Sequence, residues 1–188
     1  MELRRRFLVE EKKRIAKYCS HLIADRDNIM LDCSTTSLFI AREIKSTRKS
    51  VTVITNSLDI MNELMSCDFV RTTGIGGTLR KTTGSFCGHA ALEALGGYYA
   101  DKAFISCSAL HLSFGATDNH ESEAHIRARM LANSQNKFFV VDNTKFDAVS
   151  ANHIVALDGL DCIITDAPVS KPWQRALDKH STRLIVAD

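Results

Sequence analysis

The sequence predicts an α/β fold in which a mostly parallel sheet is covered by helices on both faces. Short apolar runs, often β-branched, alternate with segments whose apolar residues recur at helical spacing. Most of these runs end in a polar loop, as strands do in βαβ units. The chain has 188 residues, of which 45% are hydrophobic, enough to bury both faces of such a sheet.

The first half of the chain supplies the first strand–helix units. Residues 7–24 space their apolar side chains at helical intervals and predict a helix. Residues 51–54 are β-branched and predict a buried strand, with Asn56 or Ser57 placed to cap the helix that follows. The other elements expected here are strands at 29–31 and 68–73 and helices at 35–44 and 57–65.

The second half continues the alternation. Residues 76–88 predict an extended hairpin whose turns are set by Gly and Thr. A helix at 90–95 ends at Gly96-Gly97, and residues 137–141 give the clearest strand pattern in the chain. The other expected elements are strands at 103–107, 161–165 and 183–186 and helices at 120–133 and 173–179.

The charge and hydropathy patterns exclude several classes of protein. The formal net charge of +2 is too small to predict nucleic-acid binding by the whole surface. Basic residues gather near the N-terminus, but glutamates interleave with them, which indicates a solvated helix face or a linker remnant. No apolar stretch approaches the ~20 residues of a membrane span, and no secretory signal is visible. We therefore expect a cytoplasmic protein with no membrane partner.

Metal and cofactor motifs are missing from the sequence. The six cysteines show neither Cys-x-x-Cys nor zinc-finger spacing, which favours buried, reduced thiols. His120 and His125 are five residues apart and would not share a helix face. There is no Walker loop or nucleophile elbow, and the glycines at 74–77 do not open a helix as a dinucleotide fingerprint does. We expect no metal and no cofactor.

The polar loops after the strands are the candidate ligand site, because ligands bind at the carboxyl ends of parallel strands. Asp32 is followed by Cys33 and then by Ser34, Thr35 and Thr36, which lead into a helix. Free N–H groups and the positive end of the helix dipole favour an anion there. The alternative interpretation is an ordinary Ser/Thr helix cap.

Two further loops bear on the site. Lys145 follows the strand at 137–141, so it stands at the same sheet edge as Ser34 to Thr36 and would supply a positive charge to a phosphate. A plain surface lysine is the alternative. Residues 117–123 place acidic groups and a histidine at a helix start, where carboxylates also simply stabilise the helix.

Taken in order, these motifs resemble the sensor domain of DeoR-type bacterial transcription repressors, from about residue 6 to residue 166. The resemblance rests on the sequence segments 12–16, 31–36, 53–58, 76–79, 88, 101–105, 123–130, 141–146 and 164–166. It implies a Rossmann-like fold related to ribose-5-phosphate isomerase and the glucosamine-6-phosphate deaminases. It also implies a phosphorylated sugar as effector and a homo-oligomer, dimer or tetramer, that regulates transcription of sugar metabolism.

The resemblance also assigns residues and domains. Ser34, Thr35, Thr36 and Lys145 would hold the phosphate, while Asp32, Asn56, Gly76, Gly77 and Glu123 would line the sugar end or shape the pocket, with Ser57 beside Asn56. Residues 1–188 would form a single effector-binding domain, with residues 1–24 as linker remnant and leading helix. The winged helix-turn-helix that such regulators use to bind operator DNA would be absent. Ser34 departs from the family, which commonly has glycine there, and residues 108–112 replace the usual glycines.

Two alternatives remain beside the sensor. One is a sugar-phosphate isomerase or deaminase on the same fold, which would need a general base and a second acid–base group. Carboxylates are available at Asp32, Asp118, Glu121 and Glu123, but no clear partner accompanies them, so we predict that the chain is not an enzyme. The other is an interaction module without a small-molecule ligand.

Overall fold

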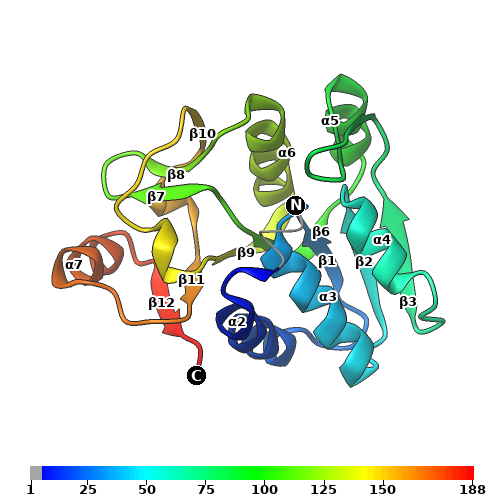
Figure 1. Ribbon diagram of the computed structural model, residues 1–188, viewed down its shortest axis with the longest axis horizontal. Coiled ribbons are helices and arrows are strands. Elements are labelled where there is room, and N and C mark those ends of the chain that lie inside the picture. Colours follow the sequence, from blue (N-terminus) through cyan, green and yellow to red (C-terminus); the bar gives the residue numbers. More distant parts are fainter. Residues whose placement is uncertain (1–5) are drawn as a thin grey trace.

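A seven-stranded parallel sheet forms the centre of the computed structural model, which describes residues 6–188 (Figure 1). The strand order is β12-β11-β9-β6-β1-β2-β3, and every neighbouring pair is parallel. The strands are β1 (Asn28–Leu31), β2 (Val51–Thr55), β3 (Val70–Gly74), β6 (Ala100–Ile105), β9 (Ser134–Val140), β11 (Cys162–Thr165) and β12 (Arg183–Val186). The predicted fold class is thus confirmed.

Helices cover both faces of this sheet, as predicted. One face packs against α2 (Val9–Leu22), α3 (Thr35–Thr47) and α4 (Leu58–Leu64), the other against α5 (His89–Gly96), α6 (Glu121–Ala132) and α7 (Lys171–Lys179). None of the helices within residues 6–188 is long and apolar enough to cross a membrane. The interleaved charges expected at the start fall partly on residues 1–5, which lie outside the described part of the chain.

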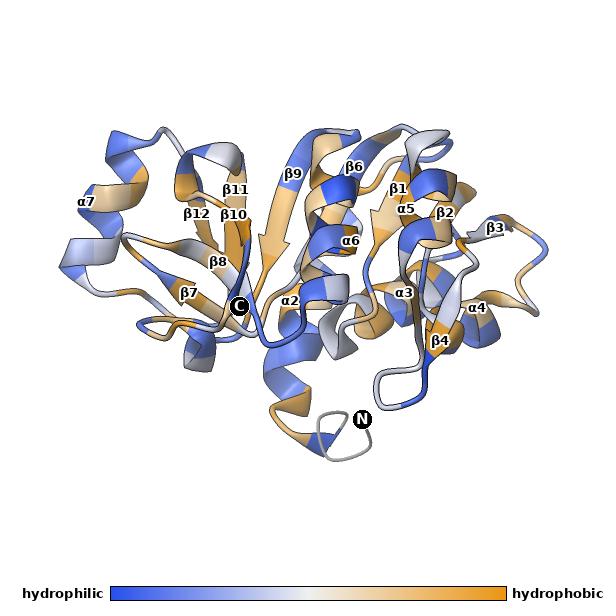
Figure 2. Ribbon diagram, turned by 90° about the horizontal axis from the view of Figure 1, so that it is seen from above, coloured by the Kyte–Doolittle hydropathy of each residue, from blue (hydrophilic) through white to orange (hydrophobic). Residues whose placement is uncertain are grey.

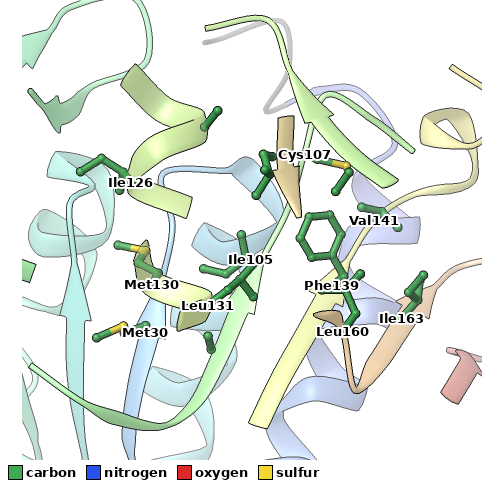
Figure 3. Packing of buried hydrophobic residues seen from close by; sticks show 14 of the residues in the cluster. Met30, Ile105, Cys107, Ile126, Met130, Leu131, Phe139, Val141, Leu160 and Ile163 are labelled. Atoms are coloured by element: carbon green, nitrogen blue, oxygen red, sulfur yellow. The ribbon is translucent and has the colours of Figure 1, made fainter. Parts of the chain in front are cut away.

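Alternation along the strands builds the two cores. In β1, Ile29 and Leu31 pack on the side of α2 to α4, while Met30 points to the side of α5 to α7. Figure 3 shows Met30 in this second core, with Phe139 from β9 and Met130 from α6. The strands β1 and β11 are largely hydrophobic in Figure 2, whereas the edge strand β3 is mostly pale and α6 carries both hydrophobic and hydrophilic residues. This is the pattern of a sheet buried on both faces by amphipathic helices.

Two small antiparallel sheets complete the fold. The predicted hairpin is present as β4 (Thr78–Arg80) and β5 (Ser85–Cys87). A second sheet, ordered β10-β8-β7, was not predicted from the sequence; its strands are β7 (Ala109–His111), β8 (Gly115–Asp118) and β10 (Asn152–Val155). These strands have three or four residues, too few to show clear alternation, and β10 pairs with a strand far from it in sequence.

The strand order places a topological switch point at the centre of the sheet. From β1 the chain continues through β2 to β3 on one side, whereas β6, β9, β11 and β12 extend the other side. The connections after β1 and β6 therefore run in opposite directions, leaving a crevice beyond the carboxyl ends of these strands. Such crevices are where open α/β sheets bind ligands.

Candidate functional site

A small cavity lies at the switch point, beyond the carboxyl ends of β1, β6 and β9. It has a volume of about 80 Å³, several times what one water molecule requires. Of the residues predicted to hold phosphate, Ser34, Thr35, Thr36 and Lys145 all line it. The other residues of its wall are Phe7, Lys12, Cys33, Thr83, Ser106, Cys107 and Asp142. Residues far apart in the sequence thus meet at one sheet edge.

The N-terminus of α3 forms one wall of this cavity. Ser34 caps the helix: its hydroxyl accepts a hydrogen bond from the Ser37 N–H at 3.1 Å and donates to Asp32 Oδ1 at 2.6 Å. The N–H groups of Thr35 and Thr36 have no acceptor among residues 6–188. With the positive end of the helix dipole, these two N–H groups favour an anion.

Two lysines contribute positive charge from other elements. Lys145 belongs to the short 3-10 helix η1 (Asn143–Lys145), and its Nζ lies 3.3 Å from Asp142 Oδ2. Lys12 on α2 is buried, and its Nζ donates to the Phe7 carbonyl at 2.6 Å. Two ammonium groups and a helix N-terminus therefore face the cavity, and among residues 6–188 Asp142 is the one carboxylate on its wall. The balance is electropositive and suits a compact anion.

Arg127 organises a buried charge cluster beside the cavity. Its Nε donates to Asp32 Oδ2 at 2.8 Å, and its Nη1 donates to Asp118 Oδ2 at 2.7 Å and to Glu123 Oε2 at 3.5 Å. Asp32 also accepts from the Ser37 hydroxyl at 2.5 Å and from the Ser106 N–H at 3.4 Å. Asp32 therefore does not line the cavity, but its hydrogen bonds hold the loops after β1 and β6 in place.

Glu123 lines a second cavity of about 240 Å³. Its Oε1 accepts from Arg80 Nη1 at 2.9 Å, Thr83 Oγ1 at 2.6 Å and Ser85 Oγ at 3.0 Å. Burial alone would raise the pKa of Glu123, but the charge of Arg127 and these hydrogen bonds outweigh it and lower the pKa to about 2. The other residues of this wall are Arg80, Thr82, Thr83, Ser108, Asp118, Asn119 and His120.

The remaining predicted site residues lie outside both cavities. Ser57 caps α4 by accepting from the Ile60 N–H, as its position in the sequence predicts. Asn56 Nδ2 donates to the Phe86 carbonyl at 2.9 Å and so joins the end of β2 to the β4–β5 hairpin. Gly77 has a φ of +145°, and a Cβ there would lie 2.7 Å from the Cys87 carbonyl oxygen. Gly76, beside it, has open space around it.

Some residues of the two cavities had been given no ligand role from the sequence. Ser106, Cys107 and Asp142 lie in the polar loops that follow β6 and β9, the kind of loop from which the site was predicted to form. The i, i+4 spacing of Glu123 and Arg127 on one helix was a usable signal for the charge cluster. The sequence did not indicate that Lys12 lines the cavity, because the position of Lys12 depends on how α2 packs against α3.

The thiols and histidines do not add a reactive or metal-binding centre. Within the described residues, no group of three or more His, Cys, Asp or Glu side chains is placed to hold a metal ion. All six cysteines are free and buried. Burial raises the pKa of the Cys33 and Cys107 thiols, which keeps them protonated beside the cavity.

Comparison with known proteins agrees with this architecture. Residues 8–167 match the model of the DeoR C-terminal sensor domain. The chain is 34% identical over 176 residues to the lactose phosphotransferase system repressor of Lactococcus lactis subsp. lactis, covering 93% of this chain and 69% of that protein. It is 30% identical over 176 residues to the uncharacterized HTH-type transcriptional regulator YulB of Bacillus subtilis, covering 94% and 67%.

A solved structure shows the same fold at low identity. Ribose 5-phosphate isomerase A of Methanocaldococcus jannaschii matches 74% of this chain and 55% of its own, with a TM-score of 0.53 and 16% identity. The predicted likeness to that isomerase fold is confirmed. The chain spans about two thirds of the length of the curated relatives it matches.

Proposed function

Since this chain belongs to the DeoR C-terminal sensor domain family, a family of transcriptional regulators and not of enzymes, we propose that it binds a phosphorylated sugar. The phosphate occupies the cavity at the switch point. The observation that carries this proposal is the convergence of the free Thr35 and Thr36 N–H groups with Lys12 and Lys145 on one small cavity. A sugar is the favoured carrier because one relative is named as a repressor of a lactose phosphotransferase system.

The proposed contacts divide into backbone and side-chain donors. Thr35 and Thr36 present N–H and hydroxyl groups, and the lysines supply charge. Ser34 acts through its backbone and as the helix cap, because its hydroxyl is already bonded to Asp32. Lys145 exchanges its contact with Asp142 for one with the phosphate.

Phosphate binding in this cavity would also affect how α2 is held against the rest of the domain. Lys12 lies on α2, so a phosphate held by Lys12, Lys145 and the start of α3 ties α2 to two other parts of the domain. A ligand shifts an equilibrium by binding one state better than another. We propose that, in a longer regulator, phosphate binding changes the arrangement of the operator-binding segments within a homo-oligomer.

A thermal-shift screen tests the proposal. The panel consists of sugar phosphates and their unphosphorylated parents, with wild type, Lys145→Ala and the control Lys171→Ala, an exposed lysine on α7. We expect at least one phosphate to raise the melting temperature of wild type and of the control, with its parent sugar inactive. Lys145→Ala should lose most of that shift. If free sugars stabilise the protein and their phosphates do not, the phosphate assignment is wrong.

A further inference from the structure

The second cavity lies on the other side of Thr83 from the phosphate cavity. Thr83, in the turn between β4 and β5, lines both. The first cavity alone, at about 80 Å³, holds little more than a phosphate group, whereas sites for small molecules span ~300–1,000 Å³. Together with the second cavity, of about 240 Å³, the space reaches the lower end of that range. A ligand with its phosphate at α3 would therefore have to extend past Thr83 to fill a site of ordinary size.

The charges of the second cavity are already matched. Arg80 pairs with Glu123, and Asp118 is bound by Arg127 and by the Ser108 hydroxyl. Arg80 Nη2 lies 2.6 Å from His120 Nε2, and because a guanidinium can only donate, Nε2 accepts and the ring is neutral in this arrangement. No side chain on this wall is a cation without a carboxylate partner. A second phosphate would meet Asp118 and Glu123 without a free positive charge.

Donors and acceptors are nevertheless both present on this wall. The Arg80 guanidinium has further N–H groups to donate, and the Ser108 hydroxyl, whose proton goes to Asp118, can still accept. His120 and Asn119 add polar groups exposed at the rim. The hydroxyl groups of a sugar both donate and accept, and they carry no charge that the wall would have to neutralise. The chemistry of the wall thus matches a polyhydroxylated, uncharged group.

We propose that the second cavity receives the hydroxyl-bearing end of a monophosphorylated sugar or polyol, that Arg80, Ser108 and His120 determine which one binds, and that bisphosphates are excluded. This rests on the proposed binding of phosphate at α3 and Lys145. Arg80 comes from the β4–β5 hairpin and His120 from the start of α6, so the specificity end is assembled from two elements.

Isothermal titration calorimetry with two variants tests this inference. His120→Ala removes a wall residue, and His125→Ala is the matched control, because His125 is exposed on the same helix and outside the cavity. The probes are inorganic phosphate, the best-binding sugar monophosphate and the corresponding bisphosphate. His120→Ala should weaken the monophosphate about 3- to 10-fold, the size of one hydrogen bond, and leave inorganic phosphate within two-fold.

A gain of function adds a second, independent test. Wild type should bind the bisphosphate about ten-fold more weakly than the monophosphate, and Thr82→Lys, which adds a charge at an exposed position of the wall, should narrow that difference. Equal affinity of wild type for both esters overturns the inference, as does an equal loss of inorganic phosphate in His120→Ala. If no phosphate compound binds wild type, the proposed function itself fails, and the inference with it.

Discussion

Replacing Glu123 by Gln should destabilise the fold in a way that depends on pH. The pKa of this carboxyl is lowered from 4.5 to about 2, because Arg127, Thr83, Arg80 and Ser85 outweigh the effect of its burial. A shift of that size corresponds to at most about 3 kcal/mol of stability. Gln keeps the shape and accepts some of the same hydrogen bonds, so we expect a loss of about 1–3 kcal/mol at pH 7.

The sign of the pH dependence follows from the direction of the shift. Between pH 4.5 and 2 the unfolded chain binds a proton at this site and the folded chain does not, so the stabilisation by Glu123 is complete above pH 4.5 and lost as the pH falls towards 2. At pH 3.5 the difference between wild type and Glu123→Gln should be smaller by about 1.4 kcal/mol than at pH 7.

Urea unfolding of both proteins at the two pH values measures this difference. Glu93→Gln is the control, since Glu93 is an exposed residue on α5 and its loss should cost less than about 0.5 kcal/mol at either pH. If Glu123→Gln is as stable as wild type at pH 7, or if the two proteins differ by the same free energy of unfolding at both pH values, Glu123 does not stabilise the fold through its charge.

Three further substitutions test the charge cluster, the conformation of Gly77 and the cap of α3, each by urea unfolding. Arg127→Met should lower the free energy of unfolding by about 3–5 kcal/mol, because it leaves buried carboxylates unpaired. Arg129→Met, on the exposed side of α6, should lower it by less than about 0.5 kcal/mol. Similar losses in the two variants would contradict the role of the cluster. Gly77→Ala should lower the free energy of unfolding by about 1–3 kcal/mol, because Gly77 has a positive φ and a Cβ there would meet the Cys87 carbonyl oxygen. Gly76→Ala should be near neutral. Equal effects of the two substitutions would mean that the backbone at Gly77 does not require glycine. Ser34→Ala should lower the free energy of unfolding by about 0.5–2 kcal/mol, and Ser34→Gly by only a few tenths of a kcal/mol. If glycine cost more than alanine, Ser34 would not act as a helix cap.

Local patterns in the sequence were sufficient for most of the large sheet. The apolar runs that became β1, β2 and β9 are buried on both sides, and a continuous apolar run bounded by polar loops is the signature of such strands. The same locality explains why the helix cap could be narrowed to Asn56 or Ser57: the bond that Ser57 makes with Ile60 spans three residues. Ser34 to Thr36 after β1 and Lys145 after β9 were expected to lie together because the carboxyl ends of parallel strands meet at one edge of the sheet, and they line the same cavity.

Strands and contacts that pair residues far apart in the sequence could not be predicted from local patterns. The sheet of β7, β8 and β10 uses strands of three or four residues, so neither periodicity nor length distinguishes them from loops. Arg127 meets Asp32 across 95 residues of sequence, and nothing near either residue specifies the other. Lys12 reaches the cavity only because α2 packs along α3.

A crystal structure of the domain with its tightest-binding sugar monophosphate would show directly whether α3 and Lys145 hold the phosphate. We expect phosphate oxygens within hydrogen-bond distance of the Thr35 and Thr36 N–H groups and of Lys145 Nζ. We also expect the rest of the ligand to pass Thr83 into the cavity beside Arg80 and His120. A ligand bound elsewhere on the domain, or one whose phosphate points away from α3, would contradict these expectations.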